Sequence, residues 1–125
     1  MYGDESYDIN TVIRQNALRR QKRFKQAHQT DAQWFVECRD LGDAFDRDAG
    51  IYFCTYDTIE EVDQCVAQRP PTNPYDRIMG IYHLAIPIDQ QEPGLSREQW
   101  LDHRAQIQNK ADIQQLITAL NQANT

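Results

Sequence analysis

Residues 51–71, IYFCTYDTIEEVDQCVAQRPP, decide the fold that the sequence predicts. The first six are mostly β-branched or aromatic, which is typical of a strand. Asp57 and Thr58 then each stand three residues before a glutamate, the spacing of a capping box, so we expect a helix to begin here. The double proline ends this helix, because proline cannot donate to the preceding turn. Its buried stripe falls on Ile59, Val62 and Val66.

Two other stretches have the composition of strands. Residues 33–38 (QWFVEC) are aromatic and β-branched. Residues 77–88 (RIMGIYHLAIPI) are apolar on both faces, so we expect them to form the central strand, with Pro87 limiting pairing near its end. Bulky residues on both faces of 51–56 also predict an internal strand. A right-handed crossover would place 77–88 parallel to 51–56, which predicts a small mixed three-stranded sheet.

Helices are predicted on both sides of these strands. Residues 9–28 form an N-terminal helix with a thin apolar stripe. Its second half, from Arg19 to Lys25, is charged on nearly all sides, so we expect that half to project from the body. A second capping box at Ser96 begins the C-terminal helices. The order of elements, with one crossover helix, predicts a single α+β domain over residues 1–125. The strongest helical stripe comprises Ile113, Leu116, Ile117, Leu120 and Ala123.

Residues 9–88 resemble ferredoxin-like domains of the muconolactone isomerase type. The similarity lies in a helix, a hairpin, a capped helix, a Pro-Tyr-Asp turn at 74–76 and a last strand. The resemblance implies a split βαβ-like topology and allows a small-molecule enzyme of the dimeric ferredoxin-like type, in which His83, Tyr52 and Tyr82 would be the residues to test. That family has a further strand before its first helix, and the polar start of this chain lacks a strand pattern.

The composition argues against several classes of protein. The chain has 125 residues, and its three cysteines have no paired spacing that would indicate a disulfide framework. Its apolar runs are too short to span a membrane, and its acidic first residues differ from a signal peptide. We therefore expect a cytoplasmic protein without a membrane partner. Nucleotide-binding, zinc-binding and serine-hydrolase motifs do not occur, so we expect no cofactor and no metal, and we favour a non-enzyme.

The charges are strongly segregated along the chain. Between residues 14 and 25 there are six basic residues and no acidic ones: Arg14, Arg19, Arg20, Lys22, Arg23 and Lys25. Residues 31–63 carry ten acidic and two basic residues, a local charge of −8 within a total of −6. Such asymmetry bears on the partners of a protein rather than on its fold. We predict that the six basic residues are binding residues.

The favoured hypothesis is a small non-enzymatic interaction protein, such as a subunit, adaptor or inhibitor, that docks on a protein partner through this polarised surface. One alternative is nucleic-acid binding, because basic helices lie along phosphate backbones. The other is the enzyme described above. A homo-oligomer is compatible with each of the three hypotheses.

Two further sequence patterns could form a cation site or a catalytic pair. The loop Asp40–Gly50 is rich in aspartate and could coordinate Ca²⁺, but its spacing departs from an EF-hand, so a solvated hairpin loop is favoured. Cys54 and His83 could form a nucleophile pair if their side chains met. A buried thiol and a core histidine are the commoner situation.

Overall fold

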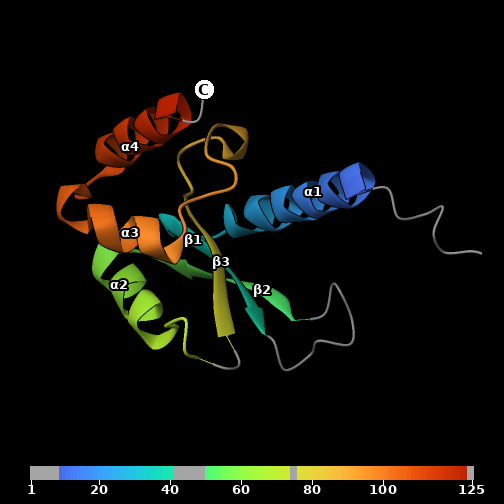
Figure 1. Ribbon diagram of the computed structural model, residues 1–125, viewed down its shortest axis with the longest axis horizontal. Coiled ribbons are helices and arrows are strands. Elements are labelled where there is room, and N and C mark those ends of the chain that lie inside the picture. The colour runs from blue at the N-terminus through green and yellow to red at the C-terminus, as the bar shows by residue number, and fades with distance from the viewer. Residues whose placement is uncertain (1–8, 41–49, 74–75, 124–125) are drawn as a thin grey trace, which may run out of the picture.

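The computed structural model describes residues 9–40, 50–73 and 76–123 of the chain (Figure 1). One helix lies on one face of a three-stranded sheet, and the other helices lie on the opposite face. In the described part of the chain, no helix combines the length and apolar character needed to cross a membrane. The elements are α1 (Ile9–Ala27), β1 (Trp34–Asp40), β2 (Ile51–Tyr56), α2 (Ile59–Gln68), β3 (Asp76–His83), α3 (Arg97–His103) and α4 (Lys110–Ala123), with short 3₁₀ turns η3 (Ile88–Gln90) and η4 (Arg104–Gln106).

The predicted α+β class and the three strands are confirmed, but the expected mixed sheet is wrong. The strand order is β2-β1-β3, and β1 is antiparallel to both neighbours, so that Trp34 pairs with Tyr56 on one side and His83 on the other. β2 and β3 run in the same direction, but β1 separates them. Both are therefore edge strands of this sheet, and the central strand is β1, whose first five residues are buried.

β3 ends at His83, five residues before the predicted end at residue 88. The side chain of Gln91 binds the backbone polar groups of His83 on the edge of β3 that faces away from β1. Its amide oxygen accepts from the His83 N–H at 2.9 Å, and its amide nitrogen donates to the His83 carbonyl at 2.7 Å. This bonding satisfies both polar groups inside the protein, and the next N–H, that of Leu84, still donates to the Gln33 carbonyl at 2.8 Å.

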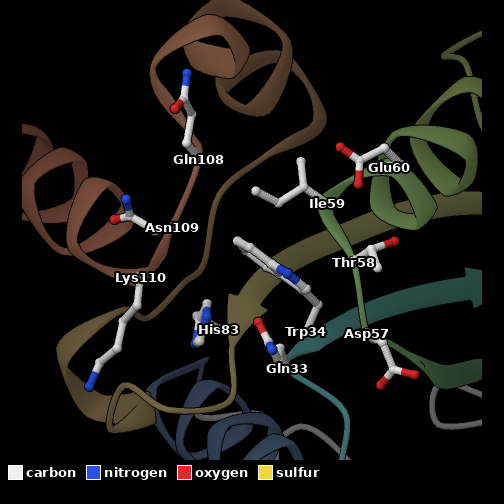
Figure 2. Close-up of a pocket in the computed structure, with 10 residues that line it drawn as sticks. All are labelled: Gln33, Trp34, Asp57, Thr58, Ile59, Glu60, His83, Gln108, Asn109 and Lys110. Carbon is white, nitrogen blue, oxygen red and sulfur yellow. The ribbon is translucent and has the colours of Figure 1, made fainter.

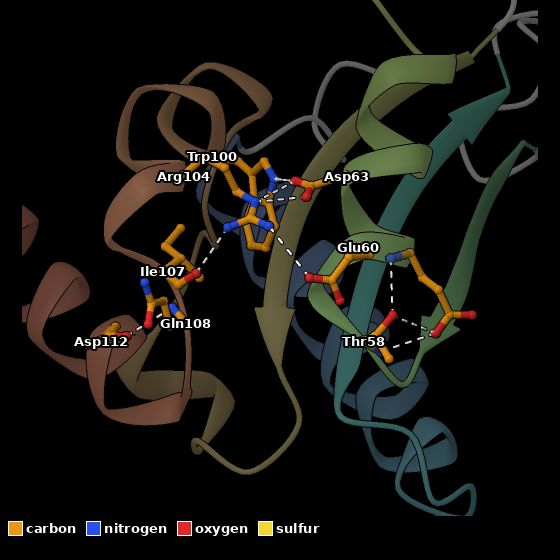
Figure 3. Close-up of polar contacts among 9 residues, drawn as sticks. Thr58, Glu60, Asp63, Trp100, Arg104, Ile107, Gln108 and Asp112 are labelled. Atoms are coloured by element: carbon orange, nitrogen blue, oxygen red, sulfur yellow. Dashed lines mark hydrogen bonds and ion pairs between the residues drawn. The ribbon is translucent and has the colours of Figure 1, made fainter.

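The two predicted capping boxes are present. Thr58 and Glu61 cap α2, and Ser96 and Gln99 cap α3, each pair satisfying the other's backbone amide (the α2 cap is drawn in Figure 3). Capping starts both helices beside the sheet face that carries Trp34. A core formed by residues of α2, α3 and α4 and by Ile107, between η4 and α4, covers that face: Val62, Cys65, Val66, Trp100, Ile107 and Ile113, with Leu116, Ile117 and Leu120 packed against it.

The second half of α1 packs on the opposite face of the sheet, so the expectation that it projects is wrong. Phe24 and Ala27 are buried there against Phe35 and Tyr82. The basic residues do not prevent this packing, because two of the arginines bind a buried carboxylate of β1. The first half of the helix extends away from the body in Figure 1.

Candidate functional site

The packing face of α1 continues into its first half, where no element of the described chain covers it. From the C-terminal end, this face passes through Ala27, Phe24 and Arg20 and then reaches Ile13 and Ile9 at helical spacing. Ile13 is 59% exposed and Ile9 is 66% exposed. The thin apolar stripe in the sequence is thus half buried against the sheet and half available to another molecule.

A groove lies between this half of α1 and the nearby end of the sheet. It encloses about 350 Å³, and we call it the α1 groove; its lining consists of Val12, Gln15, Asn16, Arg19, Arg39, Ile51 and Met79. Met79 is 43% exposed. Both charged residues in this lining are arginines, so the groove combines aliphatic surface with positive charge. The charge pattern of the sequence pointed to α1 but not to Arg39, Ile51 or Met79, which reach the groove only through strand pairing.

The six predicted binding residues do not form one cationic surface. Arg14, Arg19, Lys22 and Lys25 are exposed on α1, and Arg19 also lines the α1 groove. Arg20 and Arg23 instead turn toward the sheet. The basic cluster is therefore divided between the surface and the interior.

Arg20 and Arg23 hold a carboxylate that is almost completely buried. Glu37 of β1 is 1% exposed and accepts hydrogen bonds from Arg20 Nε at 3.0 Å and from Arg23 Nη2 at 2.7 Å. Arg20 Nη1 also reaches Glu92 at 3.2 Å. A buried carboxylate requires such partners because its desolvation is costly. These two arginines therefore fix α1 on the sheet.

His83 lies in a different pocket, at the end of the sheet near the start of α2 (Figure 2). The pocket has a volume of about 360 Å³ and also includes Trp34, whose ring meets the imidazole edge-to-face at a centroid distance of 4.7 Å. The Nδ1 atom accepts the Ala85 N–H at 3.1 Å, so the neutral ring carries its proton on Nε2. Burial and, less strongly, the charge of Lys110 lower the pKa of His83.

The residues suggested for an enzyme are not brought together. The Tyr82 hydroxyl donates to the Pro93 carbonyl at 2.8 Å in the α1 core, and the Tyr52 hydroxyl donates to Asp76 at 2.9 Å. Neither tyrosine lines the His83 pocket. Cys54 and His83 share one face of the sheet, but β1 lies between their strands. The proposed nucleophile pair is therefore not assembled.

A polar cluster beside this pocket joins α2 to α3 and η4 (Figure 3). Asp63 accepts the indole N–H of Trp100 at 2.9 Å and Arg104 Nε at 2.7 Å. Burial raises the pKa of Asp63, but these hydrogen bonds outweigh it and the net pKa is lowered. Arg104 also donates to the Ile107 carbonyl at 3.1 Å. These contacts hold α2 against α3 and η4.

Residues 41–49 of the acidic loop lie outside the described residues, so the Ca²⁺ hypothesis stays a prediction. Across the ranges that the structure describes, no group of three or more His, Cys, Asp or Glu side chains is arranged to hold a metal ion.

No known protein family has a model that matches this sequence, and comparisons with curated proteins and with solved structures give no match either.

Proposed function

We propose that this protein is an interaction protein whose α1 groove binds an acidic, amphipathic segment of a protein partner. The observation that carries the proposal is the uncovered continuation of the α1 packing face, with Ile9 and Ile13 exposed on the half of α1 that also lines the groove. Large aliphatic side chains at helical spacing provide the apolar contact that an amphipathic segment needs.

Charge supports an acidic partner. The charged residues that line the groove, Arg19 and Arg39, are both cationic. A partner that places carboxylates around an apolar stripe would match this surface, whereas a basic partner would be repelled. The whole chain is acidic, with a net charge of −6, so the groove differs in sign from the protein as a whole.

Nucleic-acid binding is supported less well. Two of the six basic residues, Arg20 and Arg23, are engaged by Glu37 and so are not available to phosphates. Exposed aliphatic residues beside the remaining cations add nothing to binding a phosphate backbone. The His83 pocket supports a small-molecule ligand as a second candidate, because Trp34 and His83 form a concave aromatic wall.

The test uses a synthetic amphipathic peptide with leucines on one face and glutamates on the other. Titrated into the ¹⁵N-labelled full chain, it should shift the amide signals of α1 and of the β1 and β2 residues at the groove. A peptide with lysine in place of each glutamate is the matched probe and should bind much more weakly. Equal binding of the two peptides would contradict the charge argument.

A pair of substitutions on the same helix separates binding by the exposed packing face of α1 from nonspecific apolar adhesion. Ile13→Ser removes an aliphatic contact worth roughly 1.5–3 kcal/mol when buried, so affinity should fall about tenfold or more. Leu18→Ser is the matched control, because Leu18 is 57% exposed on the other side of α1. The proposal is wrong if both substitutions weaken binding alike, or if anionic lipid vesicles or duplex DNA shift the groove signals and the acidic peptide does not.

A further inference from the structure

All three cysteines of the chain meet at one place, although they come from three different elements. Cys38 in β1 and Cys54 in β2 are diagonal neighbours on one face of the sheet, since Cys54 pairs with Val36 and Cys38 pairs with Tyr52. Cys65 reaches the same place from α2. The Cys38 thiol is close enough to both other thiols to shift their pKa values. Their spacing in the sequence gives no sign of this cluster.

A guanidinium, that of Arg69, lies against the cluster. Arg69 Nη1 is 3.3 Å from Cys65 Sγ, and Arg69 Nη2 is 3.3 Å from the Tyr52 hydroxyl oxygen. Its Nε is buried and has no hydrogen-bond partner among the described residues. Among the ion pairs between described residues, none includes Arg69. A partly buried cation is stabilised by nearby negative charge, and a thiolate of this cluster is placed to supply it.

The thiols differ in acidity and in access to solvent. The hydrogen bond with Cys38 outweighs burial and lowers the pKa of Cys54 to about 6; the same effect lowers the pKa of Cys65 to about 7. Cys38 is the group that retains its proton, because hydrogen bonds to the other two raise its pKa. Cys38 and Cys65 are 0% and 2% exposed, whereas Cys54 is only partly buried. Cys54 is thus both the most accessible thiol and one of the two more acidic ones.

We propose that the cluster is a peroxide-reactive site in which Cys54 is oxidised first and then forms a disulfide with Cys38. The Cys54 thiolate attacks one oxygen of a hydroperoxide, the O–O bond breaks, and the products are a sulfenic acid and hydroxide, which becomes water. The Cys38 sulfur then attacks the Cys54 sulfur. The S–S bond forms as the S–O bond breaks, and the departing hydroxide takes the Cys38 proton. In sum, two thiols are oxidised and hydrogen peroxide is reduced to two waters.

The position of the pair limits how the disulfide forms. Diagonal neighbours on antiparallel strands have Cα atoms about 7–8 Å apart, slightly beyond the usual span of a disulfide. The link therefore requires β1 and β2 to shift locally. β2 is an edge strand with every residue partly exposed, so fewer contacts oppose a shift of β2 than of the central, buried β1.

The first experiment uses the reduced full chain and equimolar hydrogen peroxide. We expect an intact mass about 2 Da lower and a peptide map that links Cys38 to Cys54. Dimedone added during the reaction should label Cys54. The oxidation rate should rise with pH around the pKa of Cys54, near 6. An unchanged mass, links only between molecules, or dimedone on Cys38 or Cys65 would each overturn the proposal.

Variants then test the order of events. Cys54→Ser should slow peroxide consumption at least about tenfold, because the remaining thiols are shielded from solvent. Cys65→Ser is the matched control and should still give the Cys38–Cys54 link. Oxidation of Cys54→Ser at the rate of the original chain would refute the role of Cys54. If a variant fails to fold, as judged by its circular dichroism, the dimedone site and the peptide map of the original chain decide the question.

Discussion

Replacing Glu37 with glutamine should greatly destabilise this protein, although the two side chains have nearly the same shape. Glu37 is buried, and two arginines from α1 donate to its two carboxylate oxygens at 3.0 and 2.7 Å. The glutamine of Glu37→Gln keeps one acceptor, but its amide N–H₂ group must face the other guanidinium. The variant therefore leaves Arg23 without its counter-charge at the interface of α1 and the sheet, while Arg20 keeps only Glu92 among the described residues.

The size of the effect follows from the exposure of the partners. Breaking a buried ion pair from one side costs about 3–5 kcal/mol. The side chains of Arg20 and Arg23 are 19% and 21% exposed, so water can partly solvate them in the variant. We therefore take the lower limit, a loss of about 3 kcal/mol in the free energy of unfolding. For a chain of this length that corresponds to a Tm lower by about 12 °C.

Urea unfolding followed by circular dichroism measures the change, with Glu60→Gln as the control. Glu60 is also a carboxylate beside an arginine, but its side chain is 79% exposed and lies 3.9 Å from Arg104. Its substitution should change the free energy of unfolding by less than about 0.5 kcal/mol. If Glu37→Gln costs no more than Glu60→Gln, then the arginines do not hold α1 in the way described here.

Two further predictions concern pH. Burial and the charge of Lys110 lower the pKa of His83, so the folded chain resists protonation of this ring. The ring should titrate below 6.5 by NMR, and Lys110→Gln should raise that midpoint. The stability tied to His83 is present above pH 6.5 and should decline as the pH falls through the folded pKa. A midpoint at or above 6.5 would contradict this. Asp63 has a lowered pKa, so its contribution is present above pH 4 and declines as the pH falls through its folded value. Asp63→Asn should therefore lower the free energy of unfolding in urea by about 1 kcal/mol at pH 7 and by progressively less in acid. A decrease that did not depend on pH would show that the charge of Asp63 is not responsible.

The sequence predicted those parts of the fold that depend on neighbours along the chain. The capping pairs at Thr58 and Ser96 lie within one helical turn, so their spacing locates the starts of α2 and α3. Strand order depends on which segments meet after the chain turns back. Bulky residues on both faces of residues 77–88 predicted a central strand. In the structure β3 has only one neighbouring strand in the sheet, and it is buried instead by helices and by the segment at Leu95. Burial on both faces is thus not sufficient to predict a central position.

The site was predictable only in part, for the same reason. The basic residues of α1 identified the helix, but nothing local distinguishes Arg20 and Arg23, which bind Glu37, from exposed Arg14. The partner of both arginines is a strand residue 14 to 17 positions away. Arg39 and Met79 of the α1 groove, and the meeting of three cysteines, likewise follow from strand pairing and helix packing.

Charge segregation in this chain therefore has two separate consequences. Part of the basic segment is neutralised by Glu37, a member of the acidic segment, and that contact holds the second half of α1 on the sheet. Because that half is fixed, the first half is held out in a defined direction, and its aliphatic residues stay exposed beside the remaining cations. A helix that was basic but loosely attached would present no fixed groove. The internal ion pairs thus position the surface that we propose binds a partner, and disrupting them should weaken binding without altering any residue of the α1 groove.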